Sequence, residues 1–102
     1  MKTTKEDILN TLKKVKSKYQ KEGIEILGLF GSYAKGTENE FSDIDIAYKL
    51  DYKKMAEQQN KNVFNVVLRI DEIKEELQKE LKKRVDFVPD KNEKILKGII
   101  YV

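Results

Sequence analysis

The sequence of 102 residues predicts a single domain of the α+β class, residues 1–102, in which a small β-sheet is packed by helices. Two long segments repeat apolar residues every three or four positions, as amphipathic helices do. Three shorter segments are rich in β-branched and aromatic residues and end at glycine, proline or polar turns, as strands do. The expected order is helix, strand, turn, strand, helix, strand and a tail with a further short helix.

An amphipathic helix is expected over about residues 4–21, where apolar side chains recur at steps of three and four. Thr3 and Glu6 have the spacing of a capping box at its start. Gly23 stands where such a helix would end.

Two strands follow this helix. The first is expected at Ile24–Phe30, and Gly28 within it indicates close approach of another backbone or of a ligand. The second is expected at residues 43–50. Because the twelve residues between them are few for a parallel crossover, we expect the two strands to be antiparallel.

The second half begins with a polar segment, residues 51–61, which we interpret as a loop. A long amphipathic helix is expected from Asn62 to about Leu81, with Asn60 or Asn62 as its N-cap. A break near Asp71 is the alternative to one continuous helix, because Asp is a good cap for a second helix.

A third short strand is expected at residues 84–88 and would be stopped by Pro89. The tail predicts a helical turn over residues 91–97 and a small strand at residues 99–102. The pattern leaves open whether this last strand packs on the sheet or on a partner.

Composition limits the chemistry. The chain has no Cys and no His, which excludes disulfides, thiolate metal sites, cysteine nucleophiles and histidine bases. Any metal must therefore be bound by oxygen ligands, which favours Mg²⁺, Mn²⁺ or Ca²⁺.

Charge and hydropathy limit the partners. The net charge is only +3, with 19 Lys and 2 Arg scattered among 18 acidic residues. Arg, the better reader of phosphates and bases, is scarce, so we do not expect nucleic acid as a substrate. There is no signal-peptide pattern and no apolar stretch of membrane-spanning length. We expect a cytoplasmic protein that does not bind membranes.

Asp43 and Asp45 stand two residues apart in the second predicted strand. Their carboxylates would leave the same face, about 6–7 Å apart at the backbone, and would repel each other. One or two hard cations would compensate for this repulsion, because two-metal sites use carboxylates of this kind. The alternative is a pair of solvent-facing aspartates on an exposed sheet.

Two further features could belong to the same site. Gly31 and Ser32 follow a strand and open a short helix, where free N–H groups and a hydroxyl can hold phosphate, although an ordinary Gly-Ser turn is the alternative. Lys35 could add positive charge towards a triphosphate. Asp86 interrupts the third apolar strand, either as a third carboxylate of the site or as a charge that protects an edge strand.

Taken together, these motifs resemble a known family. Gly31-Ser32, ten residues, and then Ser42-Asp43-Ile44-Asp45-Ile46 is similar to the nucleotidyltransferase motif of the DNA polymerase beta superfamily. The segment Arg84-Val85-Asp86-Phe87-Val88 is similar to the third-strand motif of that family. The variant most resembles the minimal nucleotidyltransferases (MNT) of bacteria and archaea. This resemblance implies the nucleotidyltransferase fold, a small mixed β-sheet whose first pair is antiparallel.

The resemblance also implies roles for individual residues. Gly31 and Ser32 would hold the β- and γ-phosphates of a nucleotide. Asp43, Asp45 and Asp86 would be the catalytic residues and would bind Mg²⁺, two ions in all. The reaction would move a nucleoside monophosphate from a nucleoside triphosphate, with ATP expected, and would release pyrophosphate. Lys35 stands where relatives often carry Arg, which weakens any bidentate contact to phosphate.

Relatives of this size are often antitoxins paired with a HEPN-domain ribonuclease toxin. The leading hypothesis from the resemblance is that this chain forms a complex with such a partner and adenylylates (AMPylates) one of its tyrosines. One alternative is a non-catalytic antitoxin that neutralises its partner by binding alone. The other is a nucleotidyltransferase that acts on a small-molecule hydroxyl, which would need a second domain or a homodimer to form the acceptor pocket.

Overall fold

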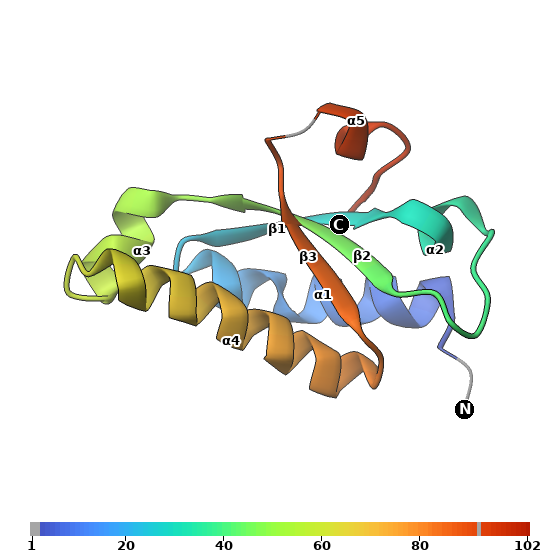
Figure 1. The fold of residues 1–102 in the computed structure, drawn as a ribbon, viewed down its shortest axis with the longest axis horizontal. Coiled ribbons are helices and arrows are strands. Elements are labelled where there is room, and N and C mark those ends of the chain that lie inside the picture. The colour runs from blue at the N-terminus through green and yellow to red at the C-terminus, as the bar shows by residue number, and fades with distance from the viewer. Residues whose placement is uncertain (1–2, 92) are drawn as a thin grey trace.

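One four-stranded sheet organises the chain, with the strand order β3-β2-β1-β4 (Figure 1). The structure is a computed structural model that describes residues 3–91 and 93–102. Strand β1 (Ile24–Phe30) pairs antiparallel with β2 (Ile44–Leu50), and β2 pairs parallel with β3 (Val85–Pro89). Strand β4 (Ile100–Tyr101) pairs antiparallel with β1. The α+β class, the mixed sheet and the antiparallel first pair are confirmed.

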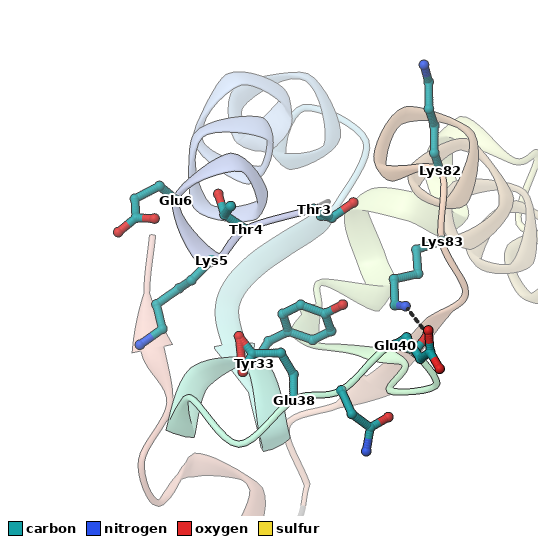
Figure 2. A pocket seen from close by; sticks show the side chains of 10 residues that line it. Thr3, Thr4, Lys5, Glu6, Tyr33, Glu38, Glu40, Lys82 and Lys83 are labelled. Carbon is teal, nitrogen blue, oxygen red and sulfur yellow. Dashed lines mark hydrogen bonds between the residues drawn. The ribbon is translucent and has the colours of Figure 1, made fainter. Parts of the chain in front are cut away.

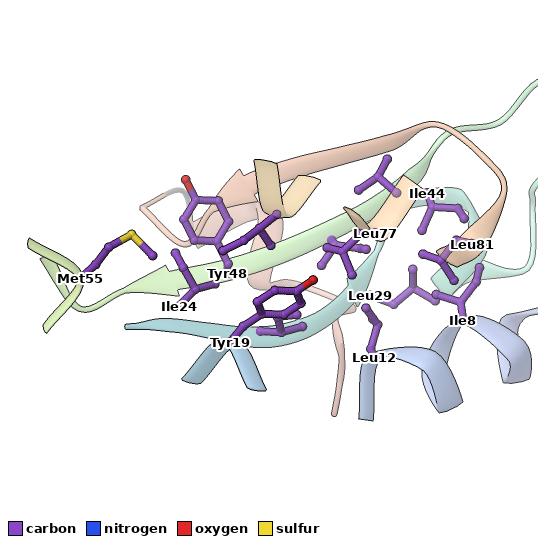
Figure 3. Packing of buried hydrophobic residues seen from close by; sticks show 14 of the residues in the cluster. Ile8, Leu12, Tyr19, Ile24, Leu29, Ile44, Tyr48, Met55, Leu77 and Leu81 are labelled. Carbon is purple, nitrogen blue, oxygen red and sulfur yellow. The ribbon is translucent and has the colours of Figure 1, made fainter. Parts of the chain in front are cut away.

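Two long helices, α1 (Lys5–Gln20) and α4 (Val63–Leu81), cover one face of this sheet and leave the other face without a long helix (Figure 1). The core lies between the helices and the sheet (Figure 3). Its largest fully buried side chains come from α1, β1, β2, α4 and the helix after β2, namely Tyr19, Ile8, Leu12, Ile24, Ile26, Leu29, Ile44, Ile46, Met55, Ile73 and Leu77. No described helix has the length and apolarity needed to cross a bilayer.

The capping box of α1 lies one residue later than the sequence predicted. Thr4, not Thr3, is the N-cap, and its hydroxyl accepts the backbone N–H of Asp7 at 3.2 Å. The Asp7 carboxylate in turn accepts the N–H of Thr4 at 3.2 Å, so Asp7 replaces Glu6 in the expected box. The sequence pattern was ambiguous here because Thr and an acidic residue both occur at two adjacent positions.

Residues 51–61 are not the loop that we predicted, because they contain the helix α3 (Tyr52–Gln58). Asp51 caps this helix, and its carboxylate accepts the N–H of Lys54 at 3.1 Å. Only Met55 and Ala56 are buried, which is enough to attach a short polar helix to the core. Such a helix has too few apolar residues to show a period in the sequence.

Helix α4 is continuous, so the alternative break near Asp71 is wrong. Of the two expected N-caps, Asn62 is the one observed, and its side chain accepts the N–H groups of Phe64 at 2.9 Å and Asn65 at 3.3 Å. The apolar stripe of Val66, Ile73, Leu77 and Leu81 is buried along its whole length. This continuous burial outweighs the local capping tendency of one aspartate.

The tail packs on the sheet of this chain. After α5 (Glu93–Leu96), within the predicted helical turn, strand β4 pairs Tyr101 with Gly28. A Cβ on Gly28 would lie 2.8 Å from the carbonyl carbon of Ile100, so the predicted close backbone approach is confirmed. The Lys16 ammonium also donates to the carbonyl of Val102 at 2.5 Å. Asn92, inside the predicted turn, lies outside the described residues.

An ionic cluster joins α1 and α4 at one edge of the core. The Arg69 guanidinium donates to both carboxylate oxygens of Glu22, at 2.6 and 2.7 Å, and to Glu76 at 2.8 Å. Glu76 also accepts the hydroxyl of the buried Tyr19 at 2.8 Å. The Arg69 side chain is only 16% exposed, so water screens these contacts poorly.

We predict that Arg69→Met lowers the free energy of unfolding by about 2–3 kcal/mol, because it removes the guanidinium that binds Glu22 and Glu76. Lys18, at 3.9 Å from Glu76, replaces this contact only in part. Urea denaturation of the two proteins measures this difference. The exposed Arg84 is the matched control, and Arg84→Met should change stability by no more than about 0.5 kcal/mol. Equal losses for the two variants would contradict the assigned role of the cluster.

Candidate active site

Acidic side chains of β2 and β3 meet on the sheet face opposite α1 and α4. In β2, Ile44 and Ile46 are fully buried under the helices, whereas Asp45 between them is half-buried on the other face. Asp45 is the register partner of Asp86 in β3. Paired residues of adjacent strands share a face and lie about 4.8 Å apart at the backbone. The structure therefore brings these two predicted carboxylates side by side.

Asp43 lies one residue before β2 and is exposed, so the predicted strand began one residue too early. It is nevertheless close enough to Asp45 for the two charges to interact. Burial, then repulsion from Asp86 and from Asp43, raises the pKa of Asp45 above its usual value. The three predicted carboxylates thus form one electrostatic unit centred on Asp45.

Gly31 forms the wall beside Asp45. Its φ of +75° lies in the left-handed region, which glycine adopts without the steric cost of a Cβ. A Cβ at this position would lie 2.8 Å from the Asp45 Cγ and closer still to one carboxylate oxygen. The glycine of the motif therefore has a local structural function, because it leaves the space that the carboxylate of the second strand fills.

Gly31 also begins the short helix α2 (Gly31–Lys35), in agreement with the predicted turn. The carbonyl of Ser32 accepts the N–H of Gly36 and, at 2.9 Å, that of Thr37, which closes the helix. The helix is fixed to the core by Tyr33, which is buried. Lys35 is exposed at its last residue. The predicted phosphate contacts of Ser32 and Lys35 stay predictions.

A compact turn leads from α2 to Asp43, and no role was predicted for it from the sequence. The Asn39 side chain accepts the N–H of Phe41 at 2.8 Å, and the Ser42 hydroxyl accepts the N–H of Asn39 at 2.9 Å. The Lys83 ammonium donates to the carbonyl of Glu40 at 3.0 Å. Asn and Ser at this spacing are typical of side-chain-capped turns, so the signal was present in the sequence. This turn fixes the direction from which the chain enters β2.

A large hollow of the described surface lies elsewhere, between the start of α1, α2 and the end of α4 (Figure 2). Its volume is about 1000 Å³, and Tyr33 forms part of its wall. Its charged lining residues are of both signs, Lys5, Lys82 and Lys83 with Glu6, Glu38 and Glu40. Because no single charge dominates it and none of the three aspartates lines it, we place the candidate active site on the sheet face.

The ligand atoms on this face suit a hard cation. The chain offers no His or Cys, and Mg²⁺ is usually held by one or two carboxylates together with water and substrate phosphates. Asp45 and Asp86 provide such a pair, with Asp43 near them. Within residues 3–91 and 93–102, no three acidic side chains converge closely enough to hold an ion by themselves.

Comparison with known proteins identifies one family. The family model described as "Polymerase beta, Nucleotidyltransferase" matches residues 10–101. The matched region includes α2, β2 and β3, and therefore all three carboxylates and the glycine beside them. No curated protein and no solved structure gave a significant match.

We predict that Gly31→Ala is more harmful than Gly36→Ala. Both glycines have a φ near +76°, at +75° and +77°, but a Cβ on Gly36 would meet nothing within 4 Å. The left-handed backbone should cost each variant about 1–2 kcal/mol. Displacement of the Asp45 carboxylate should add about 1–3 kcal/mol in Gly31→Ala only. Urea denaturation measures both, and equal losses would show that Asp45 does not depend on this contact.

We also predict that Asp45→Asn raises the melting temperature at pH 7 when divalent cations are chelated. The pKa of Asp45 is raised in the folded protein from its ordinary value of 3.8, so the unfolded chain loses this proton first as the pH rises. The contribution of Asp45 to the stability of the fold therefore falls as the pH rises above 3.8. An Asn at this position carries no charge and removes this loss of stability.

Melting curves between pH 3 and pH 7 check this sign. The difference in melting temperature between Asp45→Asn and the wild type should shrink towards about pH 3, where Asp45 is protonated in both the folded and the unfolded chain. An Asp45→Asn variant that is less stable than the wild type at pH 7 would contradict the electrostatic account.

Proposed function

The chain belongs to the polymerase beta nucleotidyltransferase family, and we propose that it moves a nucleoside monophosphate from a nucleoside triphosphate to a hydroxyl group. The observation that carries this proposal is the in-register pair of Asp45 and Asp86 beside the Gly31 turn. Phosphoryl-type transfer depends mainly on positioning and on neutralising charge, and needs no histidine or cysteine nucleophile. A composition without either residue is compatible with this chemistry.

Each motif has a role in this proposal. The backbone N–H groups at Gly31 and the Ser32 hydroxyl would bind the β- and γ-phosphates, and Lys35 would add positive charge. Asp43, Asp45 and Asp86 would hold two Mg²⁺ ions. When bound, Mg²⁺ would neutralise the triphosphate and polarise the phosphorus that is attacked. Without a cation the three carboxylates repel one another, which supports this assignment.

The transfer itself is an in-line displacement. The oxygen of the acceptor hydroxyl forms a bond to the α-phosphorus, and the bond from that phosphorus to the bridging oxygen of the β-phosphate breaks. Pyrophosphate leaves with the bonding electrons. The carboxylate of Asp86 would take the proton of the hydroxyl, because this residue is exposed and can face an incoming acceptor.

The proposal includes an acceptor and a nucleotide. We propose ATP as the donor and a tyrosine of a HEPN-domain ribonuclease partner as the acceptor, so that the chain acts as an antitoxin by adenylylation. The accessibility of the carboxylates supports a protein acceptor, because β3 is an edge strand and Asp86 and Asp43 are both exposed. A side chain carried on another protein can therefore approach the carboxylates from solvent.

The test is transfer of label from ATP labelled at the α-phosphate to a HEPN-domain partner in the presence of Mg²⁺. Asp45→Asn and Asp86→Asn should each reduce the transfer rate at least about 100-fold, because each removes a charge that the transition state requires. Glu80→Gln, an exposed change on α4, is the control and should retain the rate. Mass spectrometry locates the modified residue.

The outcomes separate the alternatives. Label on a small hydroxyl compound but not on the protein would retain nucleotidyl transfer and overturn the protein acceptor. Neutralisation of the partner by the Asp45→Asn and Asp86→Asn variants at the wild-type level would show that binding alone is sufficient. The absence of Mg²⁺-dependent label on any acceptor, with pyrophosphate release also absent, would overturn the enzymatic proposal.

A further inference from the structure

The first two turns of α4 expose a group of large apolar side chains. Val63 is 59% exposed, Phe64 68%, Val67 58% and Leu68 44%. Single apolar residues are common on protein surfaces, but a contiguous group usually marks an interaction site. The other large hydrophobic side chains that are exposed in the described part of the chain, Phe41, Tyr52 and Tyr101, come from three different segments. The apolar group on α4 therefore needs a physical explanation.

Helical spacing places part of this group in one stripe. Phe64, Val67, Leu68 and Asp71 stand at i, i+3, i+4 and i+7, so they share a face of α4. The core face of the helix is formed by Val66, Ile73, Leu77 and Leu81. The stripe, which we define as Phe64, Val67, Leu68 and Asp71, thus points away from the sheet and can contact another molecule.

The charges beside the stripe indicate its occupant. In an antiparallel pair of α4 helices in which Phe64 of each copy faces Leu68 of the other, Asp71 of one copy lies near the start of α4 of the second copy. The exposed Lys61 precedes that start by two residues. Two-fold symmetry produces this contact twice. Asp71 and Lys61 are both exposed, and neither forms an ion pair within residues 3–91 and 93–102. The stripe together with Lys61 is therefore complementary to itself in both apolar surface and charge.

We propose that this stripe pairs the chain with a second copy of itself, through antiparallel contact of the two α4 helices. The start of α4 lies at the end of the molecule away from α2 (Figure 1). Pairing there leaves the carboxylate face of each copy open. The proposal thus concerns assembly, and it holds or fails independently of the proposed transfer reaction.

Sedimentation equilibrium of the purified chain over a wide range of concentrations tests the pairing. The average mass should rise from that of the monomer towards twice that value. Leu68→Glu should raise the dissociation constant about tenfold or more, because it places a charge at the centre of the contact. Phe41→Glu is the matched control, since Phe41 is 86% exposed outside the stripe, and it should leave the dissociation constant unchanged.

A charge exchange tests the antiparallel geometry. Asp71→Lys should weaken pairing by bringing two lysines together, and so should Lys61→Asp by bringing two acids together. The double variant restores opposite charges and should recover most of the lost affinity. All of these residues are exposed, and circular dichroism confirms that each variant is folded.

Three results would overturn the proposal. The first is a wild-type chain that stays monomeric at every concentration. This is also the result expected if a different protein, and not a second copy, covers the stripe. The second is pairing that Leu68→Glu does not weaken. The third is a double charge variant that pairs no better than either single variant.

Discussion

Side-chain alternation in β2 is the constraint on which the rest of the structure depends. Successive residues of a strand point to opposite faces, so burial of Ile44 and Ile46 under the helices commits Asp45 to the open face. The parallel register extends this arrangement to β3, where Val85 pairs with Ile44 and Asp86 pairs with Asp45. A slip of one residue would bury carboxylates and expose the core. Hydrophobic packing on one face thus positions the acidic groups on the other.

This arrangement has an electrostatic cost in the folded chain. Asp45 is partly removed from water, lies beside two other carboxylates and has its pKa raised. The backbone accommodates the Asp45 carboxylate sterically at Gly31, whose missing Cβ leaves room for it. Groups that weaken a fold are commonly retained where function needs them. In this family the compensating charge would come with the nucleotide and its cations.

The helices, strands and caps that depend on strong local sequence patterns could be predicted from the sequence. The strand Ile24–Phe30, both long helices and the Asn62 cap follow from apolar periodicity and side-chain chemistry, and all are observed. Helix α3 was missed because two buried residues do not make a period. At the site, the spacing of the aspartates indicated a shared face, but the contact between Gly31 and Asp45 depends on the register between strands distant in sequence. Local patterns do not determine that register.

The most direct measurement is the location of a bound paramagnetic cation in solution. Mn²⁺ is titrated in the presence of a non-hydrolysable ATP analogue while the backbone amide signals are followed by NMR. We predict that the signals of Gly31, Asp45 and Asp86 broaden first, because these residues surround the proposed metal and phosphate positions. Broadening centred instead on the acidic residues Glu72 and Glu75 of α4, with these three signals unchanged, would contradict it.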